Sequence, residues 1–187
     1  MPDILFVVII YRKDVLFMKK LSTRKIVLVA VLAALSVVFR VFLGYPQTGN
    51  TRYDLGFLPI AAVGMLFGPV WSGIAYVLAD LVGTFAVGQS PFIPITICKF
   101  LFGFIFGLFF YKREPGLLRI ILCVLTISVV VDLIAMPLSL YALTGNGVWA
   151  LIISRLVQVG VMFPVRVVSI WLMSRYLGKY ILRYGDK

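Results

Sequence analysis

Six apolar stretches divide the chain, and short polar or Gly- and Pro-rich segments separate them. A helix needs about 20 apolar residues to cross a hydrocarbon core of about 30 Å, and all but one of the stretches have that order of length. The exception, Leu55–Phe67, can cross only where the bilayer thins or where protein shields its ends. The stretches are Ile26–Leu43, Leu55–Phe67, Val70–Val87, Phe92–Tyr111, Leu117–Leu143 and Val148–Leu177.

The punctuation between the stretches favours helices over strands. Gly and Pro cluster at the breaks, as in Gly68-Pro69 and Glu114-Pro115-Gly116, which is typical of tight turns. A transmembrane barrel would show alternating apolar and polar residues, and runs such as Leu101–Tyr111 do not alternate. The apolar fraction of 62% fits a chain whose solvent is lipid. The pattern predicts an all-α polytopic membrane protein with six transmembrane helices in one bundle.

The first 17 residues do not fit this pattern. Ile4–Ile10 is too short to span a membrane, and Asp3 before it and Asp14 after it make a poor signal peptide. Met18-Lys19-Lys20 is more typical of the start of a bacterial membrane protein. We therefore expect residues 1–17 to be an N-terminal extension without structural role, and residues 18–187 to form a single membrane domain.

Basic residues indicate the orientation of the bundle. With six spans both termini share one side, and thirteen of the 18 Lys and Arg residues fall there, so the positive-inside rule predicts that both termini are cytoplasmic in a bacterial plasma membrane. Because the formal charge of +11 concentrates at membrane edges, it needs no nucleic-acid partner. The predicted outer loops are Gly44–Asp54, Gly88–Pro91 and Thr144–Gly147.

Residue types exclude several chemistries. The chain has no histidine, and both of its cysteines lie in predicted spans, so no metal site and no cofactor are expected. The phosphate-binding loop of ATPases is absent. Asp80 and Asp132 are intramembrane carboxylates on different predicted helices, without a local partner motif. A small integral-membrane enzyme or a proton-coupled carrier using these two residues stays an alternative.

Five cations lie outside the cytoplasmic segments: Arg40, Arg52, Lys99, Arg155 and Arg166. A charge at membrane depth costs at least about 2.5–3.5 kcal/mol, so each must face a cavity, a partner charge or the surface. Only three aspartates accompany the five cations outside those segments, which leaves a surplus of positive charge. An outward-facing cavity with that surplus suits an anionic ligand.

The last predicted helix carries a polar stripe. Arg155 and Arg166 are 11 residues apart, which is within about 20° of three full helical turns. Gln158 lies one turn from Arg155 on nearly the same side. Such a stripe faces protein or water, and we expect Arg166 to pair with Asp80 or Asp132.

Several segments together resemble the S components of energy-coupling factor (ECF) vitamin transporters. The resemblance runs from about Met18 to Leu177, and its closest match is the folate-type group, which also has an end to helix four like Gly103–Tyr111 and an Arg at the position of Arg155. The segments that carry it are Lys19–Lys25, Ala30-x-x-x-Ala34, Arg52–Ala61, Gly64–Pro69 and Ala79–Gly83.

The resemblance implies a function in vitamin uptake. Such proteins capture a vitamin from outside and are not enzymes. They associate through the face corresponding to Ala30 and Ala34 with a transmembrane coupling subunit that binds two ATPase subunits.

The departures from the folate-type pattern gather near the expected pocket. They leave room for a different vitamin or precursor, and they raise the hypothesis that Lys99 and Asp132 form a compensating pair. The departures are Asp54, Ile95, Lys99, Asp132, Ser139 and Gln158.

The predicted ligand is therefore a folate-like or other anionic vitamin. Cations hold its negative charge, and the carboxylate and the carboxamide bind polar ring edges by hydrogen bonds. The predicted site consists of Arg40, Arg52, Lys99, Asp132, Arg155 and Gln158.

Overall fold

The computed structural model describes residues 23–42, 45–48, 51–53, 55–111, 116–145 and 148–185. At 45–48, 51–53, 148, 150 and 177–185 it describes the backbone alone. The expected extension at residues 1–17 lies outside the described residues. It therefore stays a prediction.

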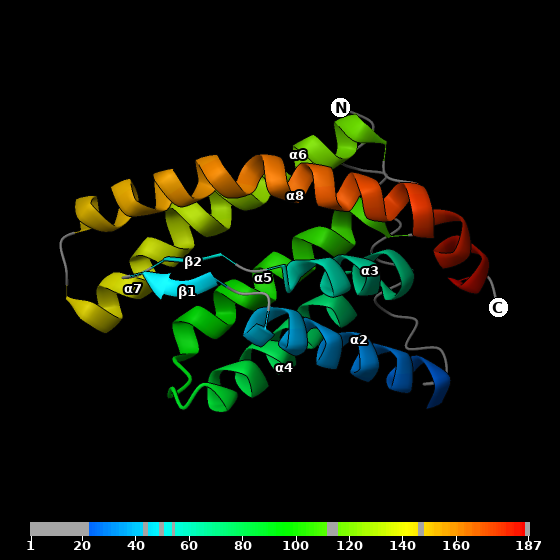
Figure 1. Cartoon of the computed structure of the whole chain (residues 1–187), viewed down its shortest axis with the longest axis horizontal. Coiled ribbons are helices and arrows are strands. Elements are labelled where there is room, and N and C mark those ends of the chain that lie inside the picture. The colour runs from blue at the N-terminus through cyan, green and yellow to red at the C-terminus, as the bar shows by residue number, and fades with distance from the viewer. Residues whose placement is uncertain are drawn as a thin grey trace.

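The described helices coincide with the six predicted spans (Figure 1). Five spans are long and apolar enough to cross a membrane, and α3 is the shorter sixth. The fifth span is continuous in sequence and consists of α6, a π-helical segment (η1) and α7. In chain order the helices are α2 (Thr23–Phe42), α3 (Phe57–Phe67), α4 (Pro69–Ala86), α5 (Ile93–Phe110), α6 (Leu117–Ile127), η1 (Ser128–Ala135), α7 (Met136–Thr144) and α8 (Val148–Gly185).

The short helix α3 is enclosed by other helices. It contacts α2, α4, α5 and α8, and the side chains of Ile60, Ala61 and Val63 are fully buried. Protein rather than lipid therefore covers α3, which explains how an apolar helix of 11 residues is accommodated in the bundle.

Glycines allow α5 to approach α3 and α4 closely. A Cβ added to Gly107 would lie 2.2 Å from Cα of Pro69, and one added to Gly103 would lie 2.4 Å from the backbone oxygen of Ser72. Gly68, at φ 88°, adopts the backbone conformation that turns the chain from α3 into α4. Small residues at these contacts are the usual means of tight helix packing in membranes.

The π-helical segment η1 is a feature that the sequence pattern did not predict. The amide of Met136 donates to the carbonyl of Val131, five residues back, so the turn is wider than in an α-helix. Asp132 lies within η1 and is buried. Since π-helical turns are often found at functional sites, this segment directs attention to Asp132.

A short hairpin occupies part of the first predicted outer loop. Strands β1 (Tyr45–Thr48) and β2 (Thr51–Tyr53) pair antiparallel, and β2 contacts α8. The sequence pattern did not predict β1 and β2, because both segments are too short to show a clear alternation of polar and apolar residues.

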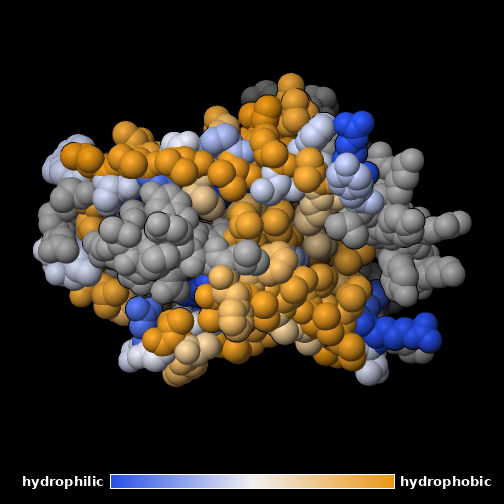
Figure 2. All heavy atoms as spheres, in the orientation of Figure 1, coloured by the Kyte–Doolittle hydropathy of each residue, from blue (hydrophilic) through white to orange (hydrophobic). Residues whose placement is uncertain are grey.

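The surface of the bundle matches a lipid environment. Figure 2 shows hydrophobic side chains across the middle of the face and hydrophilic ones toward its two ends. Large apolar side chains such as Val31, Val82 and Val157 are more than half exposed, which is costly in water but expected against acyl chains.

Candidate functional site

A cavity of about 360 Å³ lies inside the bundle. Side chains from α2, α3, α4, α5, η1, α7 and α8 line it. On α5 the lining runs from near Phe92 to Phe102, about 15 Å at the helical rise per residue. Gln89 and Ser90, in the α4–α5 connection, line the end of the cavity near Phe92.

Five of the six predicted site residues line this single cavity. Arg40, Lys99, Asp132, Arg155 and Gln158 come from four different elements, separated by up to 118 positions in sequence. The sixth predicted residue is in β2, where only the backbone is described, so its side chain is not assigned to the cavity. That residue is Arg52.

The charge of the cavity is unbalanced toward positive. Among the described residues that line it, four side chains are cationic and two are carboxylates. The cations are Arg40, Lys99, Arg155 and Arg166, and the carboxylates are Asp80 and Asp132.

On α8 a polar stripe faces the cavity, as the spacing predicted. The Nη1 of Arg155 donates to Oε1 of Gln158 at 2.6 Å, and both residues are buried. One further turn along, Met162 and then Arg166 also line the cavity. Because the carboxamide of Gln158 is neutral, this hydrogen bond brings no negative charge into the cavity.

Lys99 lies beside an aromatic pair on the cavity wall. Its Nζ is 5.0 Å from the ring centroid of Tyr76, within the range of a cation–π interaction. The ring of Tyr76 packs edge-on against Phe102, with centroids 5.3 Å apart. The ring of Tyr76 therefore stabilises the charged ammonium group of Lys99 inside the bundle.

Arg40 is bound to α4. Its Nη1 lies 2.6 Å from Oδ1 of Asp80, and its Nη2 donates to Oγ1 of Thr84 at 3.4 Å. Gly83 makes room for the arginine, because a Cβ there would lie 3.3 Å from Cδ of Arg40. This ion pair places a carboxylate beside the positive charge of Arg40.

Arg166 pairs with Asp132, one of the two partners that the sequence predicted for it. Its Nη1 donates to Oδ2 of Asp132, and its guanidinium carbon is 4.9 Å from the ring centroid of Phe102. The structure thus pairs Asp132 with Arg166 and does not support the hypothesis of a compensating pair with Lys99. Arg166 also lines the cavity, although the sequence pattern predicted only that it would pair with an aspartate.

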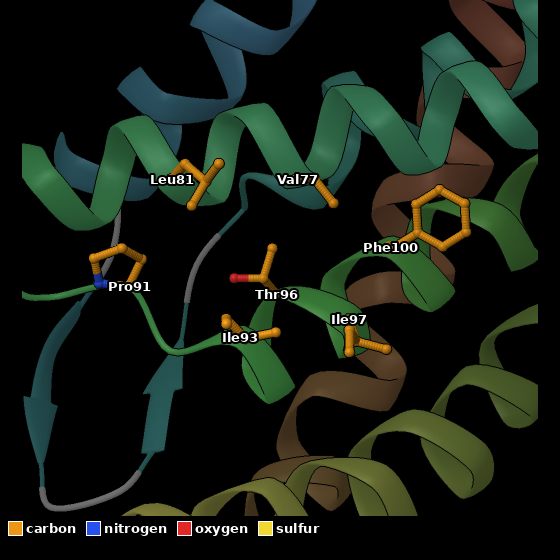
Figure 3. Close-up of a pocket in the computed structure, with 7 residues that line it drawn as sticks. All are labelled: Val77, Leu81, Pro91, Ile93, Thr96, Ile97 and Phe100. Atoms are coloured by element: carbon orange, nitrogen blue, oxygen red, sulfur yellow. The ribbon is translucent and has the colours of Figure 1, made fainter.

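A second hollow, of about 340 Å³, lies between α4 and α5 (Figure 3). Val77 and Leu81 line it from α4, and Ile97 and Phe100 line it from α5. None of the described residues that line this hollow is charged. It therefore lacks the chemistry to hold an anion.

The described residues contain no group of three or more His, Cys, Asp or Glu side chains that could hold a metal ion. Asp80 and Asp132 are on separate helices, and each forms an ion pair with an arginine. Cys98 lines the cavity and contacts Oγ of Ser139 at 3.3 Å. The arrangement offers hydrogen-bond donors, acceptors and positive charge, which are the means of binding a polar anion.

Comparisons with known proteins agree with this geometry. A family model described as "ECF-type riboflavin transporter, S component" matches residues 20–176. The folate transporter FolT of Clostridium novyi (strain NT) is 34% identical over 155 residues, which are 82% of this chain and 88% of the relative. A crystal structure of FolT bound with folic acid matches with a TM-score of 0.74 and 34% identity, covering 82% of this chain and 94% of that one.

Proposed function

The chain belongs to the family of S components of ECF-type transporters, and on that basis we propose that it captures a folate-like anionic vitamin for uptake. It is a multi-pass cell-membrane protein and a transporter subunit rather than an enzyme. S components work with an ECF module of transmembrane and ATPase subunits, which accounts for a chain without an ATPase loop.

The choice of an anionic ligand rests on the surplus of positive charge among the described residues of the cavity. In the described part of the lining, four cations against two carboxylates favour an anion, and folic acid carries carboxylates at neutral pH. Lys99 and Arg155 are the residues we assign to that negative charge. Arg40 and Arg52 are assigned supporting roles, and Asp132 and Gln158 are assigned to polar ring edges.

Riboflavin is the second candidate, because the matching family model is described as a riboflavin transporter component. Riboflavin has no net charge at neutral pH. It would offer no carboxylate to Lys99 and Arg155, whereas a folate-like ligand brings carboxylates that both cations can bind. The cavity therefore favours the folate-like ligand.

For the partner interface we assign Ala30 and Ala34. Both are exposed on α2, one turn apart on one face, so a neighbouring helix can approach closely there. This face would meet the coupling subunit, with both termini of the chain cytoplasmic.

The test is ligand binding by the purified full-length chain in detergent. Mass spectrometry identifies any small molecule that copurifies, and isothermal titration calorimetry measures folic acid and riboflavin separately. We expect folic acid to bind and riboflavin to bind more weakly. Tighter binding of riboflavin would overturn the assignment, as would failure of both vitamins to bind.

A further inference from the structure

Asp132 is placed to contact whatever fills the cavity. It lies in the widened turn of η1, and it lines the cavity together with its sequence neighbour Val131. Its side chain keeps 12% of its surface exposed, compared with 4% for Asp80, the other carboxylate of the cavity. Asp132 is therefore the more accessible acceptor.

Arg166 fixes the orientation of this carboxylate. Its Nη1 holds Oδ2 of Asp132, and the face of Phe102 supports the guanidinium group. The planar guanidinium group of Arg166 thus binds one oxygen of the carboxylate, and Phe102 fixes the position of the guanidinium group. Among the described residues Asp132 has no hydrogen bond other than this one, so Oδ1 can accept from a ligand in the cavity that Asp132 lines.

A carboxylate held in this way selects for hydrogen-bond donors. Ionised Asp accepts and never donates, and each of its oxygens can accept two hydrogen bonds, so Asp132 can bind two adjacent N–H groups of a ligand while Oδ2 also accepts from Arg166. The 2-amino-4-oxopyrimidine edge of a pterin presents such a pair, from its ring nitrogen and its amino group. A flavin edge presents one N–H between two carbonyl oxygens, and those oxygens would face the carboxylate with like partial charge.

We propose that Asp132 is a specificity-determining residue that selects a 2-amino-4-oxopyrimidine ring edge over a dioxo edge, and that Arg166 is the positioning residue that orients it. This inference rests on the proposed function and goes further, because it names the part of the ligand that lies at η1. Lys99 and Arg155 respond to the ligand's charge, whereas Asp132 responds to its donor pattern.

The experiment compares folic acid with its 2-deamino analogue, which lacks one donor but keeps the same charge. Calorimetry on the full-length wild-type chain is expected to show at least about tenfold tighter binding of folic acid, the scale of one hydrogen bond to a charged group. Asp132→Asn should bring the ratio of the two affinities close to one. An unchanged ratio in Asp132→Asn would overturn the inference.

Variants of Arg166 separate positioning from simple support of the fold. Arg166→Gln should lower the ratio, and Arg166→Lys should restore most of it. The double variant Asp132→Asn/Arg166→Gln removes both charges together, so it leaves no unpaired charge buried in the bundle. It replaces Arg166→Gln in the experiment if that single variant does not fold. Its ratio should also be close to one. If the Arg166 variants bind both ligands more weakly by the same factor, the positioning role is wrong.

Arg119→Gln is the matched control, because it removes an arginine from the start of α6, outside the cavity lining. Its affinity ratio should equal that of the wild type. If wild-type protein binds folic acid and Asp132→Asn keeps the ratio, this inference fails while the proposed function stands. If wild-type protein prefers riboflavin, or binds neither vitamin, both fail.

Discussion

Arg155 differs from the other arginines of the cavity in its partner. Arg40 and Arg166 each form an ion pair with an aspartate, whereas the hydrogen bond from Nη1 of Arg155 goes to the neutral carboxamide of Gln158. Arg155 is also 94% buried, with a relative exposure of 6%. An arginine side chain has five N–H donors, so one that binds a carboxamide can also bind an incoming anion.

Replacement of Arg155 should therefore weaken ligand binding. Arg155→Gln is expected to reduce the affinity for folic acid by roughly 10- to 100-fold, because a hydrogen bond to a charged group contributes about 1.5–3 kcal/mol. Arg155→Lys should lose less, since it keeps the charge. Calorimetry measures both, with Arg119→Gln as the control. Wild-type affinity in Arg155→Gln would remove Arg155 from the site.

At the scale of the elements, the crossing of α5 over α3 and α4 depends on glycine. The Cβ of an alanine at Gly107 would meet backbone atoms of Pro69 and Gly68, which cannot rotate away as a side chain can. Gly160 on α8 offers the opposite case, because a Cβ there meets nothing within 4 Å.

We expect Gly107→Ala to destabilise the bundle by about 1–3 kcal/mol, the usual range for overpacking. Gly160→Ala should be neutral or slightly stabilising, because alanine lowers the entropy of the unfolded chain and favours helix. Thermal unfolding in detergent compares the two variants. Equal midpoints would show that α5 can move away from α4 without loss.

The π-helical segment sets the direction of Asp132. Deletion of Val129, an exposed residue within η1, should allow the segment to revert to α-helix and rotate Asp132 relative to α7. Helix content by circular dichroism should be nearly unchanged, while folic acid binding is lost. Val129→Ala is the control and should bind normally. Retained binding in the deletion variant would mean that η1 does not position the site.

Helix positions could be predicted from the sequence, whereas local geometry could not. Apolar length alone located all six spans, because lipid requires it, and helical spacing placed Arg155 and Arg166 on one face. The amino-acid composition of Ser128–Ala135 does not reveal the widened turn, because these residues are as apolar as their neighbours. Partner choice was predicted only in part: Arg166 was expected to pair with Asp80 or Asp132, but which of the two it binds depends on how distant helices pack.

For the molecule as a whole, the exposed face of α2 is where the proposed partner would attach. Ala30→Trp together with Ala34→Trp should reduce vitamin uptake in proteoliposomes containing the ECF module by roughly tenfold, equivalent to about 1.4 kcal/mol of lost association. Binding of folic acid by the isolated chain should be unchanged, since neither alanine lines the cavity.

Leu35→Trp is the matched control for this interface. It adds the same bulk to an exposed position of α2 about 100° around the helix from Ala34. Uptake by this variant should be close to that of the wild type. If it loses as much uptake as the alanine variants, the effect of bulk on α2 is general and the interface is not specific to Ala30 and Ala34.

The surplus charge of the cavity also has an electrical consequence. Among the described residues that line the cavity, cations outnumber carboxylates by two, and a bound dianion offsets this difference. Moving one elementary charge through 100 mV changes the energy by about 2.3 kcal/mol. The membrane potential therefore acts more strongly on the charge of the vacant cavity than on that of the loaded one. In a cell with a negative interior, the potential favours the cytoplasmic side for the surplus charge of the vacant cavity, and a bound dianion removes this preference.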